Sequence, residues 1–303
     1  MTLRYSAPTA LEYFATLVHS DEHFPLFEAA ACVAHDEYPE LDVQQLLGDV
    51  DQLQARLRRR LAPDAASLQR LQVLNQFFYG DLGFGGNVNN YYDPENSYLN
   101  AVLRTRRGIP VSLAVLWMEL AQGLGLQVRG VAFPGHFMVK ALLPQGQAVL
   151  DPLTGQSLSR EELLERLAPY QRREGVLGDE EPPLGLYLQA ATPRDILARM
   201  LRNLKEIHQS QKDYPRLLSV LDRLVILQPE MWDERRDRGL AHAACGHTQQ
   251  AVADLEAYLA DNTQAWVLQS DGTYQRLHPT GNQHARSAQG QLLERLTTPL
   301  PVR

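Results

Sequence analysis

A histidine and an aspartate lie at the ends of two predicted neighbouring strands. His136 and Asp151 are 15 positions apart, and a turn is predicted between them at 144–147. In an antiparallel pair folded at that turn, we expect positions 136 and 151 to lie opposite each other near the strand ends. A carboxylate there would orient the imidazole through one ring nitrogen and leave the other nitrogen free to act as a base.

The start of a predicted buried helix supplies a third feature. Gly108 ends one segment, and Pro110 suits the first position of a helix, where its missing N–H costs nothing. The dipole and free N–H groups of such a terminus favour a nearby anion, for example a thiolate or an oxyanion. Ser112 is the only hydroxyl nearby. The candidate catalytic set is therefore His136, Asp151 and Ser112. In the alternative, His136 bridges strand and helix by hydrogen bonds and Asp151 caps a turn.

The elements that must position these residues are typical of an α+β domain. A helix is predicted to run from Pro110 to about Ala121, and its apolar residues on nearly all sides indicate that it is buried. The hydrophobic period then changes from 3.6 to 2 residues. This change predicts a short antiparallel sheet with strands over 128–133, 136–143 and 148–151.

Helical patterns flank this core. Residues 9–82 have apolar side chains at helical spacing, and Ser159 with Glu162 has the spacing of a capping box that begins a helix over 160–167. Arginines occupy positions 56, 58, 59 and 60 at the end of one N-terminal helix. An anion-binding patch there is one interpretation. Cations suit the C-terminal end of a helix dipole, so we expect a solvated helix end.

A loop rich in amide and phenol groups precedes the buried helix. Asn87, Asn89, Asn90 and Tyr91 are candidate binding residues, because loops of this composition suit peptide recognition. The same residue types also suit turns that cap themselves. The glycine-rich segment at 80–86 lacks the Gly-Lys-Ser/Thr ending of a phosphate-binding loop, so nucleotide binding gains little support.

The C-terminal third contains a repeat with a period of 34 residues. Leu204 matches Arg238, and His208 matches His242, within two copies that span about 198–263. Gly239 is a small residue where two helices would pack closely. The pattern resembles the tetratricopeptide repeat, a helix–turn–helix unit of this period; a plain pair of helical hairpins is the alternative. Because about three units are usually needed for independent stability, we expect the module to pack on the N-terminal domain. We expect the two histidines to pack between helices rather than bind a metal.

The composition excludes several classes of protein. The chain has 303 residues, a net charge of −7 and 44% hydrophobic residues, which indicates a globular protein of about two domains. A sequence pI near 5.7 argues against a nucleic-acid binder. Two cysteines, Cys32 and Cys245, are too few for a disulfide scaffold or a structural zinc site. The start has no signal-peptide pattern, and no apolar stretch approaches the ~20 residues of a membrane span. We expect a cytoplasmic protein without metal or cofactor; a monomer is compatible with the sequence, which leaves the oligomeric state open.

Three motifs together resemble the transglutaminase-like (papain-like) core, and more narrowly the bacterial SirB/YchA-type family. They are Arg-Gly-Ile-Pro-Val-Ser-Leu at 107–113, Phe-Pro-Gly-His-Phe at 133–137, and Asp-Pro at 151–152, with Glu-Tyr-Pro at 37–39 as further support. That family joins such a domain to C-terminal tetratricopeptide repeats, and the resemblance covers about residues 10–263. Transglutaminase-like enzymes use a cysteine at the helix start as nucleophile, a histidine as base and an aspartate to orient it. Here the ungapped match places Pro110 at that position, and neither cysteine corresponds to it.

The resemblance implies an α+β fold with a helical N-terminal part, a transglutaminase-like core and an α-helical repeat module. We place the first domain at 1–173, a linker at 174–191, the repeats at 192–263 and a tail at 264–303, with poor order expected from 279. We expect a regulatory or peptide-binding protein that recognises a protein or peptide partner, with a degenerate cleft. The alternatives are a hydrolase or acyl-transferase on amide or ester bonds that uses Ser112, and an adaptor in which only the repeats act.

Overall fold

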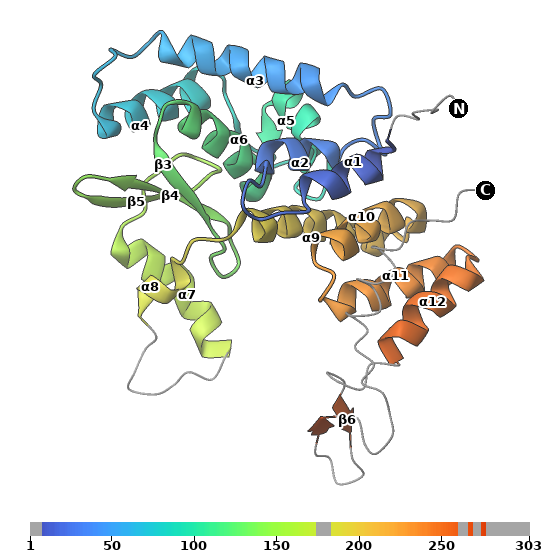
Figure 1. Cartoon of the computed structure of the whole chain (residues 1–303). Coiled ribbons are helices and arrows are strands. Elements are labelled where there is room, and N and C mark those ends of the chain that lie inside the picture. Colours follow the sequence, from blue (N-terminus) through green and yellow to red (C-terminus); the bar gives the residue numbers. More distant parts are fainter. Residues whose placement is uncertain (1–7, 174–182, 260–265, 269–273, 277–303) are drawn as a thin grey trace. The chain divides into compact units, whose positions relative to one another are not determined.

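The structure, a computed structural model, describes residues 8–173, 183–259, 266–268 and 274–276 (Figure 1). The chain divides into two compact units, residues 1–207 and 208–303, so the division falls within one long helix, α9 (Pro193–Gln211). The predicted limit between linker and repeats, at 191–192, falls just before the start of this helix.

The first unit begins with helices, as the apolar spacing predicts. They are α1 (Ala10–Leu17), α2 (Leu26–Cys32), α3 (Val43–Arg58), α4 (Ser67–Asn75) and a π-helical turn, η1 (Gln76–Asp81). Side-chain caps fix two of the starts: Thr9 and Glu12 form a capping box on α1, and Asp42 accepts hydrogen bonds from the first turn of α3. The helical pattern predicted over 9–82 ends at Asp81, where the wider π turn closes.

Helix α6 (Pro110–Gly123) is the centre of this unit. Pro110 stands at its first turn, and eleven residues of the helix are buried. It packs against α2, α3, α4 and α5 (Leu99–Thr105) and against the sheet. Arg58 and Arg70 donate hydrogen bonds to the carbonyls of Gly123 and Leu124, 2.9 and 2.8 Å away, and so satisfy its C-terminal end. The prediction of a buried helix from Pro110 is confirmed.

A three-stranded antiparallel sheet follows, in the order β3 (Gln127–Val131), β4 (Met138–Leu143) and β5 (Gly146–Leu150). All three predicted strands are therefore present with shifted ends. Val139 pairs with Leu150, so in this register the residue that would face Asp151 is Met138 rather than His136. Before the sheet, two short strands, β1 (Gly85–Gly86) and β2 (Arg107–Gly108), pair in parallel beside the start of α6.

Helices α7 (Arg160–Arg173) and α8 (Leu184–Tyr187) lie together beside the sheet (Figure 1). The predicted capping box holds: Glu162 N donates to Ser159 Oγ and Ser159 N to Glu162 Oε2. Leu184 and Leu188 belong to the same buried cluster as Val149 and Leu163. The predicted linker 174–191 thus includes a packed helix, because its two leucines cover the sheet; residues 174–182 lie outside the described residues.

The second unit contains α10 (Tyr214–Leu227), α11 (Trp232–Ala244) and α12 (Thr248–Leu259), followed by a pair of strands, β6 (Trp266–Leu268) and β7 (Tyr274–Arg276). The 34-residue period reappears in the backbone. Lys212 and Gly246 are 34 residues apart, and both have a positive φ, 56° and 77° respectively. In each copy the amide of the following residue donates a hydrogen bond of 2.9 Å to a histidine carbonyl, that of His208 in the first copy and that of His242 in the second. At Gly239 a Cβ would lie 3.0 Å from Leu255 Cγ, so close helix packing explains this glycine. The predicted tail from 279 lies outside the described residues.

No helix in the described part of the chain combines the length and the hydropathy that crossing a membrane requires.

Candidate functional site

The loop after β5 places Asp151. Its Oδ1 accepts a hydrogen bond of 3.0 Å from Leu153 N, and its main-chain carbonyl accepts one of 2.7 Å from Gly155 N. This is the turn that an aspartate before proline favours. Tyr79 donates 3.1 Å to the Pro152 carbonyl and lies against Gly155, whose φ is +73°. The loop is therefore fixed from within and by the partly buried ring of Tyr79.

His136 lies in a tight turn just before β4, not on the strand as predicted. Its amide donates to the Phe133 carbonyl at 3.1 Å, and Gly135 takes φ +68° with the Tyr170 hydroxyl packed directly against it. His136 Nε2 is nevertheless 3.0 Å from Asp151 Oδ1. The two side chains meet because both residues lie just beyond the paired ends of β4 and β5.

The carboxylate of Asp151 has partners on both oxygens. Arg166 of α7 donates to Oδ2 at 3.0 Å, while His136 contacts Oδ1. Burial alone would raise the pKa of Asp151, but the hydrogen bonds from His136, Leu153 and Arg166 outweigh it and lower the pKa to about 2. Because a carboxylate can only accept, His136 Nε2 carries the hydrogen and Nδ1 of the neutral ring remains available as a base.

Ser112 is fully buried at the first turn of α6. Its hydroxyl donates 2.6 Å to the Asn96 carbonyl and accepts 3.1 Å from Ile109 N. These bonds join the helix start to the preceding loop and leave the hydroxyl turned away from solvent. Pro110 and Val111 are buried as well. The geometry therefore gives Ser112 a structural role and does not support it as the nucleophile.

We expect Ser112→Ala to lower the free energy of unfolding by about 1 kcal/mol, because the Asn96 carbonyl and the Ile109 amide each lose a buried hydrogen bond and keep only the 3.2 Å bond that joins them to each other. Urea denaturation monitored by circular dichroism would measure this. Ser67→Ala, at the start of α4, serves as the control and should change stability by less than about 0.5 kcal/mol. An equal effect of the two substitutions would contradict the structural role.

The loop before α5 is stabilised by an asparagine that the sequence analysis missed. Asn96 is buried, and its side chain donates to the carbonyls of Asn90 and Tyr91 at 2.7 and 3.2 Å. Asn87 in turn donates to Asn96 Oδ1 at 3.1 Å and accepts from Asn90 N at 3.2 Å. Asn87 and Asn90 therefore cap the loop itself, whereas Asn89 and Tyr91 are exposed.

Arg199 of α9 lies between this loop and the turn that carries His136. Its guanidinium is 6.0 Å from the centre of the Phe137 ring, and it is within electrostatic range of Tyr91 and Tyr170. Burial lowers the pKa of Arg199. The structure thus brings Tyr91 towards the His136 side of the unit, together with two residues, Tyr170 and Arg199, that no sequence motif indicated.

Within the first unit, no cysteine takes the place of the missing nucleophile at the start of α6. Cys32 is fully buried in α2, among the N-terminal helices. Cys245 belongs to the second unit, at the end of α11. The described residues also contain no group of three or more histidine, cysteine, aspartate or glutamate side chains that could hold a metal ion.

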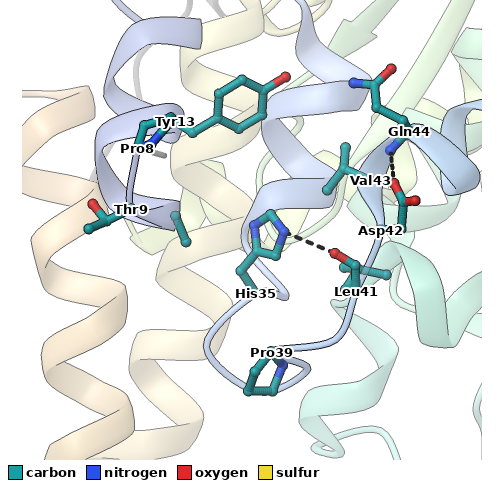
Figure 2. A pocket seen from close by; sticks show the side chains of 10 residues that line it. Pro8, Thr9, Tyr13, His35, Pro39, Leu41, Asp42, Val43 and Gln44 are labelled. Carbon is teal, nitrogen blue, oxygen red and sulfur yellow. Dashed lines mark hydrogen bonds between the residues drawn. The ribbon is translucent and has the colours of Figure 1, made fainter. Parts of the chain in front are cut away.

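A separate pocket of about 530 Å³ lies among the N-terminal helices (Figure 2). His35 Nε2 lies 3.2 Å from the Leu41 carbonyl, and Asp42 Oδ1 accepts 2.9 Å from Gln44 N. These contacts hold the turn between α2 and α3. The pocket is formed by elements other than β4, β5 and their loops, so it is not part of the His136 site.

A buried helix packed on a small antiparallel sheet, with a histidine–aspartate pair just beyond the ends of its strands and a helical repeat module after it, defines a transglutaminase-like protein with tetratricopeptide repeats. The family model of the transglutaminase-like superfamily matches residues 44–202, and a tetratricopeptide repeat model matches residues 204–270. The chain belongs to the UPF0162 family of this superfamily.

Relatives in several bacteria carry that family name. A UPF0162 protein of Xylella fastidiosa is 39% identical over 243 residues, which cover 79% of this chain and 84% of the relative. A UPF0162 protein of Pseudomonas aeruginosa is 32% identical over 67% of this chain and 72% of its own length. One of Pasteurella multocida is 29% identical over 79% and 86%. No solved structure matches significantly.

Proposed function

We propose that this protein is a non-catalytic, regulatory protein that binds a peptide or protein partner. The observation that carries the proposal is the start of α6, where Pro110, Val111 and Ser112 are all buried. Covalent catalysis on amide bonds needs an exposed, activated nucleophile beside the base. The pair of His136 and Asp151 is retained at 3.0 Å, but the helix start offers it no group that can attack.

The surroundings of His136 suit recognition of a peptide. His136 is about one-fifth exposed, and Arg199, Tyr170 and Tyr91 add a cation and two phenol groups on the same side of the unit. Such groups donate hydrogen bonds to carbonyl and carboxylate oxygens. We therefore propose that the surface around His136 forms a cleft whose ligand is an extended peptide with an acidic side chain or a terminal carboxylate.

The repeat module supports a second contact with the same partner. Tetratricopeptide repeats stack helix pairs into surfaces that commonly bind other proteins. The proposal has three further parts. The protein is cytoplasmic, it does not bind nucleic acid, and it is of the narrower SirB/YchA type. The hydrolase or acyl-transferase alternative requires Ser112 to leave two buried hydrogen bonds, and no observation favours it.

A peptide-display selection against the full chain tests the proposal. We expect enriched acidic peptides whose affinity, measured by fluorescence anisotropy, falls about tenfold in His136→Ala and Arg199→Gln. His19→Ala removes an exposed histidine of the same unit and should leave affinity unchanged. Labelling of the wild type by a fluorophosphonate probe, or peptide cleavage that His136→Ala abolishes, would contradict a non-catalytic role. Peptides that bind all variants equally would contradict the proposed cleft.

A further inference from the structure

Three arginines surround a pocket between α3 and the end of α5, among elements distinct from those that carry His136. The pocket has a volume of about 300 Å³ and is lined by Arg56, Arg104 and Arg106. This volume lies at the lower end of the range of small-molecule sites, ~300–1,000 Å³. Leu46, Leu53 and Leu103 form the apolar part of its lining. Arg56 belongs to the basic stretch that the sequence analysis interpreted as a solvated helix end.

Two of these arginines have no carboxylate partner among the described residues. The guanidinium of Arg56 lies 5.6 Å from the centre of the Phe77 ring, and that of Arg106 lies 4.7 Å from the centre of the Phe84 ring. Stacking on a ring face orients a guanidinium and leaves its N–H groups free to donate. Burial and the nearby charge of Arg56 lower the pKa of Arg106, so the two cations repel each other. An anion between them would remove this repulsion.

The third arginine is held differently. Arg104 is paired with Glu95, whose two carboxylate oxygens accept hydrogen bonds of 3.2 and 3.0 Å from one guanidinium nitrogen. Its charge is therefore already balanced. The excess positive charge of the pocket comes from Arg56 and Arg106.

The backbone of Arg106 indicates that its side chain has a use. Arg106 ends α5 in the left-handed conformation, with φ 61° and ψ 21°, where glycine is favoured. Its amide donates 2.9 Å to the Val102 carbonyl, and its own carbonyl accepts 3.0 Å from Gly85 N. A residue other than glycine has a conformational cost at this position, and a function of the arginine side chain would account for its presence there.

The same pocket also contains groups that accept hydrogen bonds. Asp49 contributes a carboxylate, which accepts 3.0 Å from Gln45 Nε2, and Asn100 Oδ1 is buried without a hydrogen-bond partner. Both groups accept hydrogen bonds. A ligand that satisfies all of these groups must therefore carry both an anionic group and hydrogen-bond donors such as hydroxyls.

We propose that this pocket binds a small phosphate ester that carries hydroxyl groups. The phosphate lies between Arg56 and Arg106, because guanidinium groups match phosphate oxygens in charge and geometry. The hydroxyls donate to Asp49 and Asn100.

Isothermal titration calorimetry of the full chain with glycerol 3-phosphate, inorganic phosphate and glycerol tests this assignment. We expect glycerol 3-phosphate to bind more tightly than inorganic phosphate, and glycerol alone to give no heat. Arg56→Gln and Arg106→Gly should each weaken glycerol 3-phosphate binding at least about tenfold. Arg59→Gln removes an exposed arginine of the same helix end that does not line the pocket, and it should bind like the wild type.

The Arg106→Gly variant also separates binding from folding. Glycine suits the left-handed position, so the midpoint of thermal unfolding should not fall while affinity does. The proposal is overturned if neither phosphate compound binds, if Arg59→Gln weakens binding as much as Arg56→Gln, or if inorganic phosphate binds and glycerol 3-phosphate does not. The outcome does not depend on the peptide-binding cleft, since no variant touches His136 or Arg199.

Discussion

Replacing Asp151 by asparagine is expected to lower the free energy of unfolding by about 2 kcal/mol at pH 7. The side chain is 8% exposed and accepts hydrogen bonds from His136, Arg166 and Leu153. These contacts favour the charged form in the folded protein and lower its pKa from 3.8 to about 2. A difference of this size corresponds to about 2 kcal/mol. Asp151→Ala should lower stability further, by about 3 kcal/mol in total, because Leu153 N also loses its acceptor.

The effect depends on pH with a definite sign. A carboxyl group with a lowered pKa in the folded state contributes its full stabilisation above the unfolded pKa, near 4. That contribution is lost as the pH falls through the folded pKa, near 2. The stability of the wild type and of Asp151→Asn should therefore differ at pH 7 and converge between pH 4 and pH 2.

Urea denaturation at a series of pH values would measure this convergence. Asp64→Asn removes an exposed carboxylate of the same unit and should leave both the stability and its pH profile nearly unchanged. A constant difference between wild type and Asp151→Asn down to pH 2 would show that the charge of Asp151 is not what stabilises the loop.

Gly155→Ala is expected to lower the free energy of unfolding by about 3 kcal/mol, whereas Gly83→Ala should lower it by about 1 kcal/mol. Both glycines have φ near +70°, so an added Cβ imposes similar backbone strain at either site. At Gly83 nothing lies within 4 Å of that Cβ. At Gly155 it would lie 2.4 Å from two carbons of the Tyr79 ring. The ring must then move and release its hydrogen bond to Pro152.

The comparison isolates packing from backbone strain, since only the surroundings of the two glycines differ. Thermal unfolding of both glycine variants would measure the two losses. The variant Tyr79→Phe, which removes only the hydrogen-bond donor, would show how much of the loss in Gly155→Ala comes from the hydrogen bond to Pro152. We expect Tyr79→Phe to account for about 1 kcal/mol of the loss in Gly155→Ala. Equal losses for the two glycine variants would contradict the proposed contact between Tyr79 and the Asp151 loop.

The sequence predicts the core of this unit well where one strong pattern acts alone. Pro110 begins a helix that is apolar on nearly every side, so both its start and its burial follow from residue types. The alternation after Val128 predicts the strands for the same reason. The alternation of side chains over 137–143 predicts that His136 lies on the same strand. Pro134 and Gly135 instead allow a tight turn, and this turn ends only after His136.

The partners of the site are harder to predict, because they come from distant segments. Arg166 and Tyr79 lie on helices, and their sequence pattern does not distinguish them from other residues of an amphipathic helix. Only the packing of those helices brings them to the Asp151 loop. The structural role of Ser112 could have been predicted from the sequence. A hydroxyl in a helix that is buried on all sides must have a hydrogen-bond partner, and the main chain beside it is the nearest one.

The enclosure of α6 has a consequence for how the chain can be divided. The family match begins at residue 44, yet α2, which precedes it, packs directly on α6. A recombinant fragment that starts at residue 44 would leave the apolar α2-facing side of α6 in water. Exposed patches of this kind favour aggregation. Helix α2 is thus as necessary to a soluble product as the residues that the family model matches.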